Sequence, residues 1–447
     1  MAHWAETATF WHVYPLGFVG APPSAADAGA AAPRLRRLNN WLDYLIELGM
    51  NGLLLGPVFA SETHGYDTVD HYVVDPRLGA EADLVDLFDQ AASKGIRVVL
   101  DGVFNHVGRS FTALTEVVER GDSSPFASWF RRRPDGTFNT FEGHERLVAL
   151  NHEEPQVVDY VTDVMTYWLD RGASGWRLDA AYAVPTDFWR EVTERVRAKH
   201  PDVWLLGEVI HGDYASFVTK TGVDSVTQYE LWKATWSSLN DSNFYELAWA
   251  MERHEELLET FVPQTFLGNH DVTRIASQLV DHRHLAHALV LLLTTAGIPS
   301  IYAGDEQGMV GLKEQREGGD DTIRPAFPDH PELRLPAAEE DMLSLHRELV
   351  SLRRRHPWLV RARTVVEHLT NEQLLLRVTD GTSSLLVALN LDEPDAFVLP
   401  SQPWRLVSGL GQVAGNCVFL AAHGWCVLAP DDAAAPEGSE FVPDLDG

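Results

Sequence analysis

Short apolar runs along the chain end in side chains that could do acid–base chemistry. In the run GWRLDAAYAV (175–184), Arg177 and Asp179 stand two residues apart among Trp, Leu and Ala, where a charged pair is costly unless a function requires it. Three further runs end in a similar way, with the polar residues Asp101, Asn105, His106, Glu208, Asn269, His270 and Asp271. A single acid in such a place is commonly a solvated loop residue or a helix cap. Three acids that converge, Asp179, Glu208 and Asp271, favour a catalytic site instead.

Two carboxyl groups that face one site are the groups that glycoside hydrolysis uses, one as the acid and the other as the nucleophile. Because like charges held close together raise one pKa, one of the two carboxyl groups keeps its proton at neutral pH. Arg177 lies on the same face of an extended segment as Asp179, so we expect it to hold Asp179 ionised and make this aspartate the nucleophile. Glu208 has no such cation beside it in the sequence, and we expect it to be the acid.

The remaining polar residues suit the later part of the same reaction. Once Asp179 carries the sugar, its charge is gone, so Glu208 becomes more acidic and can activate water as a base. Asp271 would face the positive charge that develops on the sugar ring, while His106 and His270 would donate to sugar hydroxyls. The pattern therefore predicts a retaining glycosidase reaction, in which the anomeric configuration is preserved.

A (β/α)8 barrel would bring these residues together. Runs rich in Val, Ile, Leu and Tyr alternate with helical patterns over about 350 residues, which is typical of βα units and a parallel sheet. We expect the eight strands at 10–18, 51–59, 96–104, 174–180, 203–209, 225–230, 263–269 and 299–304. Catalytic groups of such a barrel gather at the C-terminal ends of its strands. A doubly wound parallel sheet is the alternative.

Two segments depart from the barrel pattern. Between the third and fourth strands, a stretch with Gly, Pro, Arg and aromatic residues lacks a long helical period, and we interpret it as an inserted domain at 107–154. After Pro357, short strands separated by turn signals indicate a C-terminal antiparallel β-sandwich domain at 358–447, whose acidic end we expect to be disordered. Residues 1–106 and 155–357 then form the catalytic barrel.

The bulk properties narrow the class of partner. The formal net charge of −30 disfavours nucleic acid, whose phosphates would be repelled, and suits an uncharged substrate. The most apolar run, 285–298, is too short to cross a membrane and indicates a buried helix that leads into a strand. The first residues lack a secretory signal, and we expect Cys417 and Cys426 to be reduced thiols. These features favour a cytoplasmic protein without a membrane partner.

The order of the motifs resembles that of the α-amylase superfamily, glycoside hydrolase family 13. The matching motifs are THGYDTVDHY (63–72), DGVFNHVG (101–108), LVALN (147–151), GWRLDAA (175–181), GEV (207–209) and LGNHD (267–271). They occur in the family's order over nearly the whole chain, which makes the resemblance specific. It implies a (β/α)8 barrel in which Asp179 is the nucleophile, Glu208 the acid/base and Asp271 the transition-state stabiliser.

The resemblance also implies which residues bind the sugar at the cleaved bond. These residues are Tyr66, His64, Asp101, His106, Arg177, His270, Asp321 and Arg324. Tyr66 would stack on the sugar ring, and Asp321 and Arg324 would bind a further hydroxyl. No cofactor is required by this chemistry. A calcium ion at Asn105 stays open, since the same Asn holds calcium in some members of the family and ties a loop together in others.

The inserted segment resembles that of neopullulanases and cyclomaltodextrinases, which act on small linear or cyclic maltooligosaccharides inside cells. GRSFTALTEVVERGDSSPFASWF (108–130) carries this resemblance. Those enzymes usually have an N-terminal β domain that shapes their dimers, whereas the first strand here begins near residue 10, so a homodimer would use another surface. Amylases of long polymers often follow the fourth-strand motif with Lys-His, where this chain has Tyr182 and Ala183. We therefore expect α-1,4 cleavage of short or cyclic glucans, of the cyclodextrin or cyclic maltosyl-maltose type.

Three classes of function remain at this point. Transglycosylases and disaccharide phosphorylases of the superfamily use the same catalytic residues as the hydrolases, and they differ only in whether a sugar hydroxyl, phosphate or water attacks the intermediate. A catalytically inactive binding scaffold is the third class. The joint presence of Asp179, Glu208 and Asp271 argues against such a scaffold, and we expect a small α-glucan hydrolase.

Overall fold

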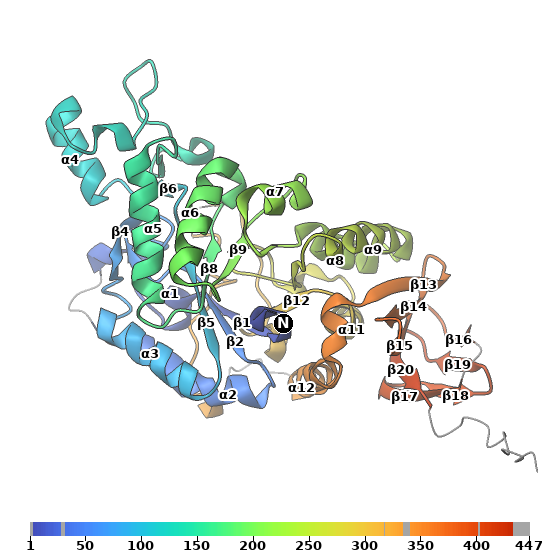
Figure 1. The fold of residues 1–447 in the computed structure, drawn as a ribbon. Helices are drawn as coiled ribbons and strands as arrows, with labels where there is room; N and C mark the ends of the chain where they lie inside the picture. Colours follow the sequence, from blue (N-terminus) through green and yellow to red (C-terminus); the bar gives the residue numbers. More distant parts are fainter. Residues whose placement is uncertain (1–2, 28–31, 317, 334–339, 401–402, 432–447) are drawn as a thin grey trace, which may run out of the picture.

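A sheet of eight parallel strands forms the centre of the larger part of the protein (Figure 1). The computed structural model describes residues 3–27, 32–316, 318–333, 340–400 and 403–431. The strand bounds are β1 Phe10–Val13, β2 Gly52–Leu55, β5 Arg97–Gly102, β8 Gly175–Leu178, β9 Trp204–Gly207, β10 Ser225–Val226, β11 Gln264–Phe266 and β12 Ile298–Tyr302. Each expected strand is present, but it is shorter than the apolar run that predicted it, because the end of each run leaves the sheet and enters a loop.

The sheet closes on itself. Neighbouring strands follow the order β10-β9-β8-β5-β2-β1-β12-β11, and a parallel bridge between Thr227 and Gln264 joins the two end strands. The backbone N–H of Gln228 donates to the carbonyl of Gln264 across the same junction, at 2.9 Å. A doubly wound sheet would leave two open edges, so the closure confirms the (β/α)8 barrel.

Side-chain alternation along the strands points three charged residues into the barrel. In β5, Leu100 packs outward against the helices while Val99 lies in the barrel interior, so Asp101 follows on the inner face. Asp101 stands opposite Arg177 of β8, and β9 pairs with β8 on its other side. Glu208 directly follows β9. Asp101, Arg177 and Glu208 therefore meet at the C-terminal end of three neighbouring strands.

The N-terminal end of the barrel is filled by apolar side chains. Phe10 of β1 stacks on Trp204 of β9 with ring centroids 5.0 Å apart. The other members of this cluster are Ala5, Ala8, Leu54, Val99, Leu206, Val262 and Ile298. The barrel is thus a packed core at this end, and its polar side chains occupy the other end.

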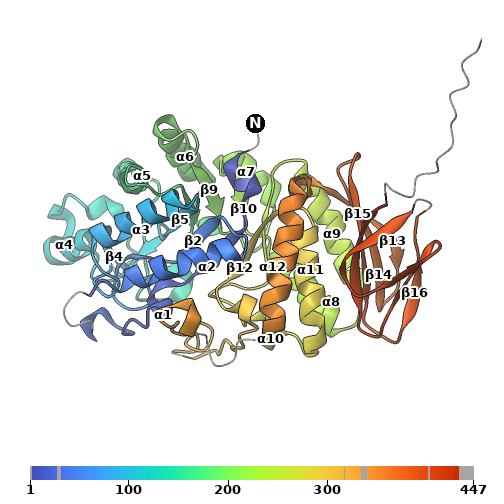
Figure 2. The same cartoon turned by 90° about the horizontal axis from the view of Figure 1, so that it is seen from below.

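Helices surround the barrel (Figures 1 and 2). The longer ones are α3 Glu81–Ser93, α5 Pro155–Leu169, α6 Thr186–Lys199, α7 Tyr214–Thr221, α8 Tyr229–Asn240, α9 Phe244–Leu258, α11 Leu285–Thr294 and α12 Glu340–Arg355. The short ones are α1 Pro15–Phe18, α2 Leu42–Glu47 and α10 Ile275–Gln278. α11 is the buried helix expected in 285–298, and it leads into β12. Within the described ranges, none of the helices has the length and hydropathy that a membrane span requires.

Two excursions at the C-terminal end of the barrel carry further polar residues. After β2, the hairpin of β3 Phe59–Ser61 and β4 Thr68–Val74 holds Tyr66 in its turn. After β5, the expected inserted segment projects from the barrel (Figure 1) and contains α4 Thr112–Arg120. The pairing of β6 His106–Val107 with β7 Val148–Ala149 fixes the base of the insert, and His106 with it.

The C-terminal region consists of two antiparallel sheets. The first contains β13 Arg363–Leu369, β14 Gln373–Thr379, β15 Ser384–Asn390, β20 Trp425–Pro430 and β17 Trp404–Gly409, and the second contains β16 Asp395–Val398, β19 Cys417–Leu420 and β18 Gln412–Ala414. Leu375 belongs to the core between the two sheets, while its neighbours Leu374 and Leu376 join the core of the barrel. This alternation confirms the expected sandwich. Cys417 and Cys426 are free thiols, and the acidic end at 432–447 lies outside the described residues.

Candidate active site

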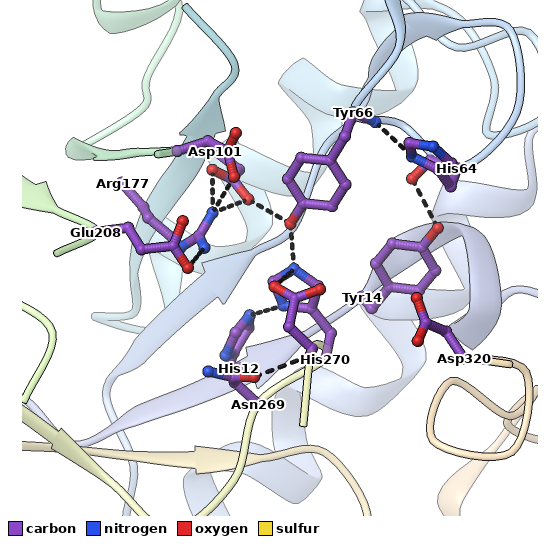
Figure 3. A network of polar contacts seen from close by, with 12 residues as sticks. His12, Tyr14, His64, Tyr66, Asp101, Arg177, Glu208, Asn269, His270 and Asp320 are labelled. Atoms are coloured by element: carbon purple, nitrogen blue, oxygen red, sulfur yellow. Dashed lines mark hydrogen bonds and ion pairs between the residues drawn. The ribbon is translucent and has the colours of Figure 1, made fainter. Parts of the chain in front are cut away.

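Arg177 lies between the carboxyl groups of Asp101 and Glu208 (Figure 3), and that of Asp179 is also in contact with it. Nη1 of Arg177 is 2.7 Å from each carboxylate oxygen of Asp101 and 3.4 Å from Oδ1 of Asp179. Its Nη2 is 2.6 Å from Oε1 of Glu208. The expectation that Glu208 lacks a cation was therefore wrong. Because β9 lies beside β8, Glu208 reaches the far side of the same guanidinium, and its contact is the shorter of the two.

Opposing electrostatic effects act on Asp179. Burial raises the pKa of Asp179 well above its usual range, the charge of Glu208 raises it further, and Arg177 opposes both effects. Burial and the neighbouring carboxylate therefore favour the protonated form of Asp179, and the guanidinium favours its carboxylate. One carboxylate and one carboxylic acid are the protonation state that a double displacement at a sugar requires.

Glu208 is held by groups that the sequence did not indicate. Its Oε2 accepts a hydrogen bond from the backbone N–H of Ala180 at 3.0 Å, and its Oε1 accepts one from the Tyr229 hydroxyl at 3.2 Å. Asn269 in turn donates to the Tyr229 hydroxyl at 2.9 Å. Ala180 has φ +44°, a strained left-handed conformation for a residue with a Cβ. This strain lies directly after Asp179 and aims a backbone donor at the acid.

The surroundings of Asp271 shift its pKa in the opposite direction from that of Asp179. Oδ1 of Asp271 is 2.8 Å from Nη2 of Arg324, and its Oδ2 is 2.9 Å from Nε2 of His270. Burial alone would raise the pKa of Asp271, but His270 and Arg324 lower it well below its usual range. Asp271 therefore stays ionised at neutral pH. Such a fixed negative charge can stabilise positive charge that develops on a substrate.

Arg324 reaches the site together with a different carboxylate from the one expected. Its Nη2 is 3.0 Å from Asp320, and its Nε donates to the carbonyl of His270 at 2.8 Å. Asp321 is exposed. Adjacent aspartates in a turn point in different directions, and the sequence does not reveal which of the two faces inward.

Tyr66 and His270 connect the two groups of charges (Figure 3). The Tyr66 hydroxyl donates to Asp101 at 3.0 Å and contacts Nε2 of His270. The Tyr66 ring lies parallel to that of His270, as does Tyr14 on the other side, with centroids 5.5 and 5.7 Å apart. Nδ1 of His64 accepts the backbone N–H of Tyr66 at 3.2 Å. These contacts build an aromatic wall of the site.

His12 and Tyr14 were missed in the sequence, although both lie at the end of the first strand. Nε2 of His12 is 3.2 Å from Nδ1 of His270. Burial lowers the pKa of His12 well below its usual range, and the neighbouring His270 adds to this effect. A neutral His12 can accept the Nδ1 proton of His270 and so orient its ring. A polar residue at the end of this first strand was the available signal.

His106 links the barrel to the inserted segment. Its Nε2 contacts the carbonyl of Tyr66 at 3.1 Å, and its Nδ1 is 3.0 Å from the side-chain nitrogen of Asn105. The His106 ring stacks on Phe141 of the insert with centroids 4.8 Å apart. Beside this stack, a groove of about 360 Å³ lies between the insert and the barrel. Its lining is Asn105, Arg133, Asn139, Thr140, Phe141, Glu142, Ala149 and Ala183.

The family model for the α-amylase catalytic domain matches residues 29–329, which include every predicted catalytic residue. The chain belongs to the α-amylase family. A cyclomaltodextrinase from Geobacillus thermopakistaniensis is 30% identical over 95% of this chain and 77% of its own length. A maltogenic α-amylase from Bacillus acidopullulyticus is 31% identical over 80% of this chain and 64% of its own length. This chain is thus an α-amylase-family glycoside hydrolase, and it spans part of the length of these relatives.

Solved structures of two other sugar-processing enzymes share this architecture. A debranching enzyme from Nostoc punctiforme, soaked with acarbose, superposes with a TM-score of 0.81 at 27% identity, over 95% of this chain and 98% of that chain. The ligand-free cyclic α-maltosyl-(1→6)-maltose hydrolase from Arthrobacter globiformis superposes with a TM-score of 0.82 at 25% identity, over 96% and 100%. Both likenesses extend over the barrel, the insert and the C-terminal sandwich.

The residues around Asn105 do not fit the calcium ion that some α-amylases hold. Calcium takes six to eight oxygen ligands, several of them carboxylates. Among the described residues that line the groove beside Asn105, Glu142 has the one carboxylate, which accepts the Tyr182 hydroxyl at 2.8 Å. Arg133 lines the same groove and donates to Thr140 at 2.8 Å. A guanidinium among the lining groups opposes a divalent cation.

Removal of calcium is therefore expected to leave the catalytic rate unchanged. The enzyme would be dialysed against EGTA and assayed on a linear maltooligosaccharide, with and without added calcium. About 1 mM calcium would be added back, because this concentration fills even weak calcium sites. Equal kcat and KM in both samples are the expected result. A rate that falls in EGTA and returns with calcium would show that Asn105 and its neighbours do recruit the ion.

Proposed function

We propose that this enzyme is a retaining hydrolase that cuts α-1,4-glucosidic bonds in short or cyclic maltooligosaccharides. The observation that carries the proposal is the arrangement of Asp179 and Glu208 around one guanidinium, that of Arg177, with the ionised Asp271 linked to them through His270 and Tyr66. Two carboxyl groups on one guanidinium, together with a third carboxyl group that stays charged, supply the groups of a double displacement.

In the first step, the carboxylate of Asp179 attacks the anomeric carbon. The bond from that carbon to the leaving oxygen breaks, and the leaving oxygen takes the proton of Glu208. The charge that develops on the sugar faces Asp271. The strained turn at Ala180 contributes its N–H to Oε2 of Glu208, which stabilises the carboxylate that Glu208 becomes.

In the second step, water replaces the departed sugar. Glu208, now a carboxylate, accepts a proton from the water as the water oxygen bonds to the anomeric carbon. The ester to Asp179 breaks and returns its electron pair to the carboxylate. Two inversions leave the α configuration in the product. Arg177 contacts both acids. It can therefore stabilise the negative charge on either of them without a change of its own position.

The size of the substrate is suggested by the loop after β8. Amylases of long polymers often have a Lys-His pair at this place, where this chain has Tyr182 and Ala183. Tyr182 donates to Glu142 of the insert, and Ala183 lines the adjacent groove. This hydrogen bond joins the insert to the rim of the barrel and reduces the space for a substrate on that side. The names of the similar proteins, a cyclomaltodextrinase and a cyclic α-maltosyl-(1→6)-maltose hydrolase, support small or cyclic glucans as substrates.

Two further parts of the proposal concern the setting of the enzyme. A relative at 28% identity, over 69% of this chain and 56% of its own length, is called an intracellular maltogenic amylase of Bacillus subtilis, which supports a cytoplasmic location. An uncharged oligosaccharide is the partner that a chain of net charge −30 would accept more readily than nucleic acid. If the enzyme forms a homodimer, we expect the interface away from the C-terminal ends of the strands.

Product analysis tests the proposal against its rivals. Maltotriose, maltohexaose, a cyclodextrin, cyclic maltosyl-maltose, sucrose and trehalose would each be incubated with the enzyme, with and without phosphate. Proton NMR would follow the first anomer released, and chromatography the chain lengths. We expect α-anomeric glucose and maltose from the linear and cyclic α-1,4 substrates.

Each other outcome would indicate a different function or mechanism. Products longer than the substrate would indicate a transglycosylase, and glucose 1-phosphate formed only with phosphate would indicate a phosphorylase. A first-formed β anomer would contradict the double displacement. Complete inactivity on every sugar, with unchanged binding of maltotriose, would support a scaffold.

A further inference from the structure

Three potential metal ligands meet on the side of the molecule where the barrel adjoins the C-terminal sandwich. Asp281 and His284 come from the turn that precedes α11, and His423 comes from the turn that precedes β20. One ligand atom from each of the three lies within 4.8 Å of the others. Nε2 of His284 is 3.0 Å from Nδ1 of His423, across 139 residues of sequence. The mechanism uses none of these residues.

The ring of His284 lies beside that of His423. The residue is buried, and its ring centroid lies 5.2 Å from that of His423 and 5.1 Å from that of His287. An imidazole nitrogen is the commonest metal ligand in proteins, and the contacts of the rest of the ring orient it.

The other two groups are held in place by hydrogen bonds. His423 has φ +53°, and its backbone N–H donates to the carbonyl of Asp392 at 3.1 Å. Both carboxylate oxygens of Asp281 accept hydrogen bonds from the Arg283 side chain, Oδ1 at 2.9 Å and Oδ2 at 2.5 Å. The Arg283 side chain is 62% exposed, so it can swing into solvent and release one carboxylate oxygen.

We propose that Asp281, His284 and His423 bind one divalent transition-metal ion of the zinc type. Two imidazole nitrogens, one carboxylate oxygen and a water molecule form a tetrahedral set that zinc prefers and that calcium or magnesium does not. Tetrahedral ligands at zinc lie about 3.3 Å apart, so the two nitrogens need to separate by only a few tenths of an ångström. A rotation of Asp281 closes the third position.

An ion in this place would join two domains. The turn before α11 belongs to the barrel, and the turn before β20 belongs to the sandwich, so the native state alone brings the ligands together. Binding therefore stabilises the folded, docked arrangement, and the temperature of unfolding rises with the logarithm of the ion concentration once the site is filled. Because the mechanism uses none of the three ligands, no change in kcat is expected.

Calorimetry on the full-length enzyme tests the site. Metal would be removed with EDTA and the chelator then removed by dialysis, and the enzyme would be titrated with zinc chloride. We expect one strong binding site and an increase of the unfolding temperature with zinc, but neither with magnesium nor calcium. His423→Asn and His284→Gln should each weaken this site by on the order of 100-fold. Asn is chosen at 423 because it tolerates a positive φ.

Two matched variants separate this site from surface binding. His330 is exposed and distant in sequence, so His330→Asn should bind zinc like the wild type. Arg283→Gln frees the carboxylate of Asp281 and should strengthen binding. If zinc binds without saturation, or if binding is unchanged in both His423→Asn and Asp281→Asn, the proposal is wrong and the His284–His423 contact is a hydrogen bond between domains. Asp281 is partly exposed, so its variant is expected to fold.

Discussion

An Asp179→Asn enzyme is expected to lose at least about 10⁴-fold in kcat/KM, because an amide cannot form the glycosyl ester. The same variant is expected to fold, since Asn has nearly the shape of Asp. Burial raises the pKa of Asp179, which means that the folded enzyme holds this charge at a cost. The neutral amide removes that cost, so the unfolding temperature should be unchanged or higher. Initial rates on maltohexaose and thermal unfolding by circular dichroism measure the two effects.

Glu208→Gln is the comparison that separates the two acids. Loss of a general acid lowers the rate by roughly 10²–10⁴-fold on a sugar leaving group. A maltosyl fluoride or nitrophenyl maltoside has a leaving group that needs no proton, so its first step should be nearly unaffected in Glu208→Gln. Asp179→Asn should be inactive on both kinds of substrate. If Asp179→Asn retained activity on maltohexaose, the assignment of the nucleophile would be wrong. Equal losses in both variants on the fluoride would contradict the division of roles.

The barrel and the meeting of its charged residues could be predicted because both follow from local periodicity. A run such as 96–104 has the length and composition of a buried strand, and alternation then decides that Asp101 points inward. Parallel strands bring their C-terminal ends to one edge. Asp101, Arg177 and Glu208 therefore meet in the structure as their strand positions imply.

Contacts that depend on tertiary packing could not be predicted in this way. Arg177 stands two residues from Asp179 in sequence, which suggested an exclusive pair, yet its shorter contact is with Glu208 of the next strand. Tyr229 reaches Glu208 from a helix start 21 residues later. The left-handed turn at Ala180 leaves no mark in the residue type. These three features depend on contacts in the folded chain, and the sequence does not show which residues make them.

Acid is expected to unfold this enzyme steeply between pH 6.5 and 4. Four fully buried histidines, His71, His254, His287 and His346, have pKa values lowered to about 4, in each case mainly by burial. Each holds a backbone carbonyl as a neutral ring, for example His71 on Val103 at 2.8 Å. The unfolded chain restores the ordinary value of about 6.5.

The sign follows from proton counting. Between pH 6.5 and 4 the unfolded state binds more protons than the folded state, so the free energy of unfolding falls as the pH falls through this window. Each such histidine contributes up to about 1.4 kcal/mol per pH unit, and the four together up to about 5.5 kcal/mol per pH unit. Because a folded protein is stable by only about 5–15 kcal/mol, most of the stability present at pH 7 is lost near pH 5.

Urea unfolding at pH 7, 6 and 5 measures this slope. His346→Leu removes one buried ring that bonds only the Met342 carbonyl of its own helix, and it should lower the slope by about 1.4 kcal/mol per pH unit. Replacement of the exposed His330 by Gln should leave the slope unchanged. A pH-independent free energy of unfolding between pH 7 and 5 would mean that these histidines are protonated in the folded state. Their carbonyl contacts would then be charge-assisted hydrogen bonds, and burial would not keep the rings neutral.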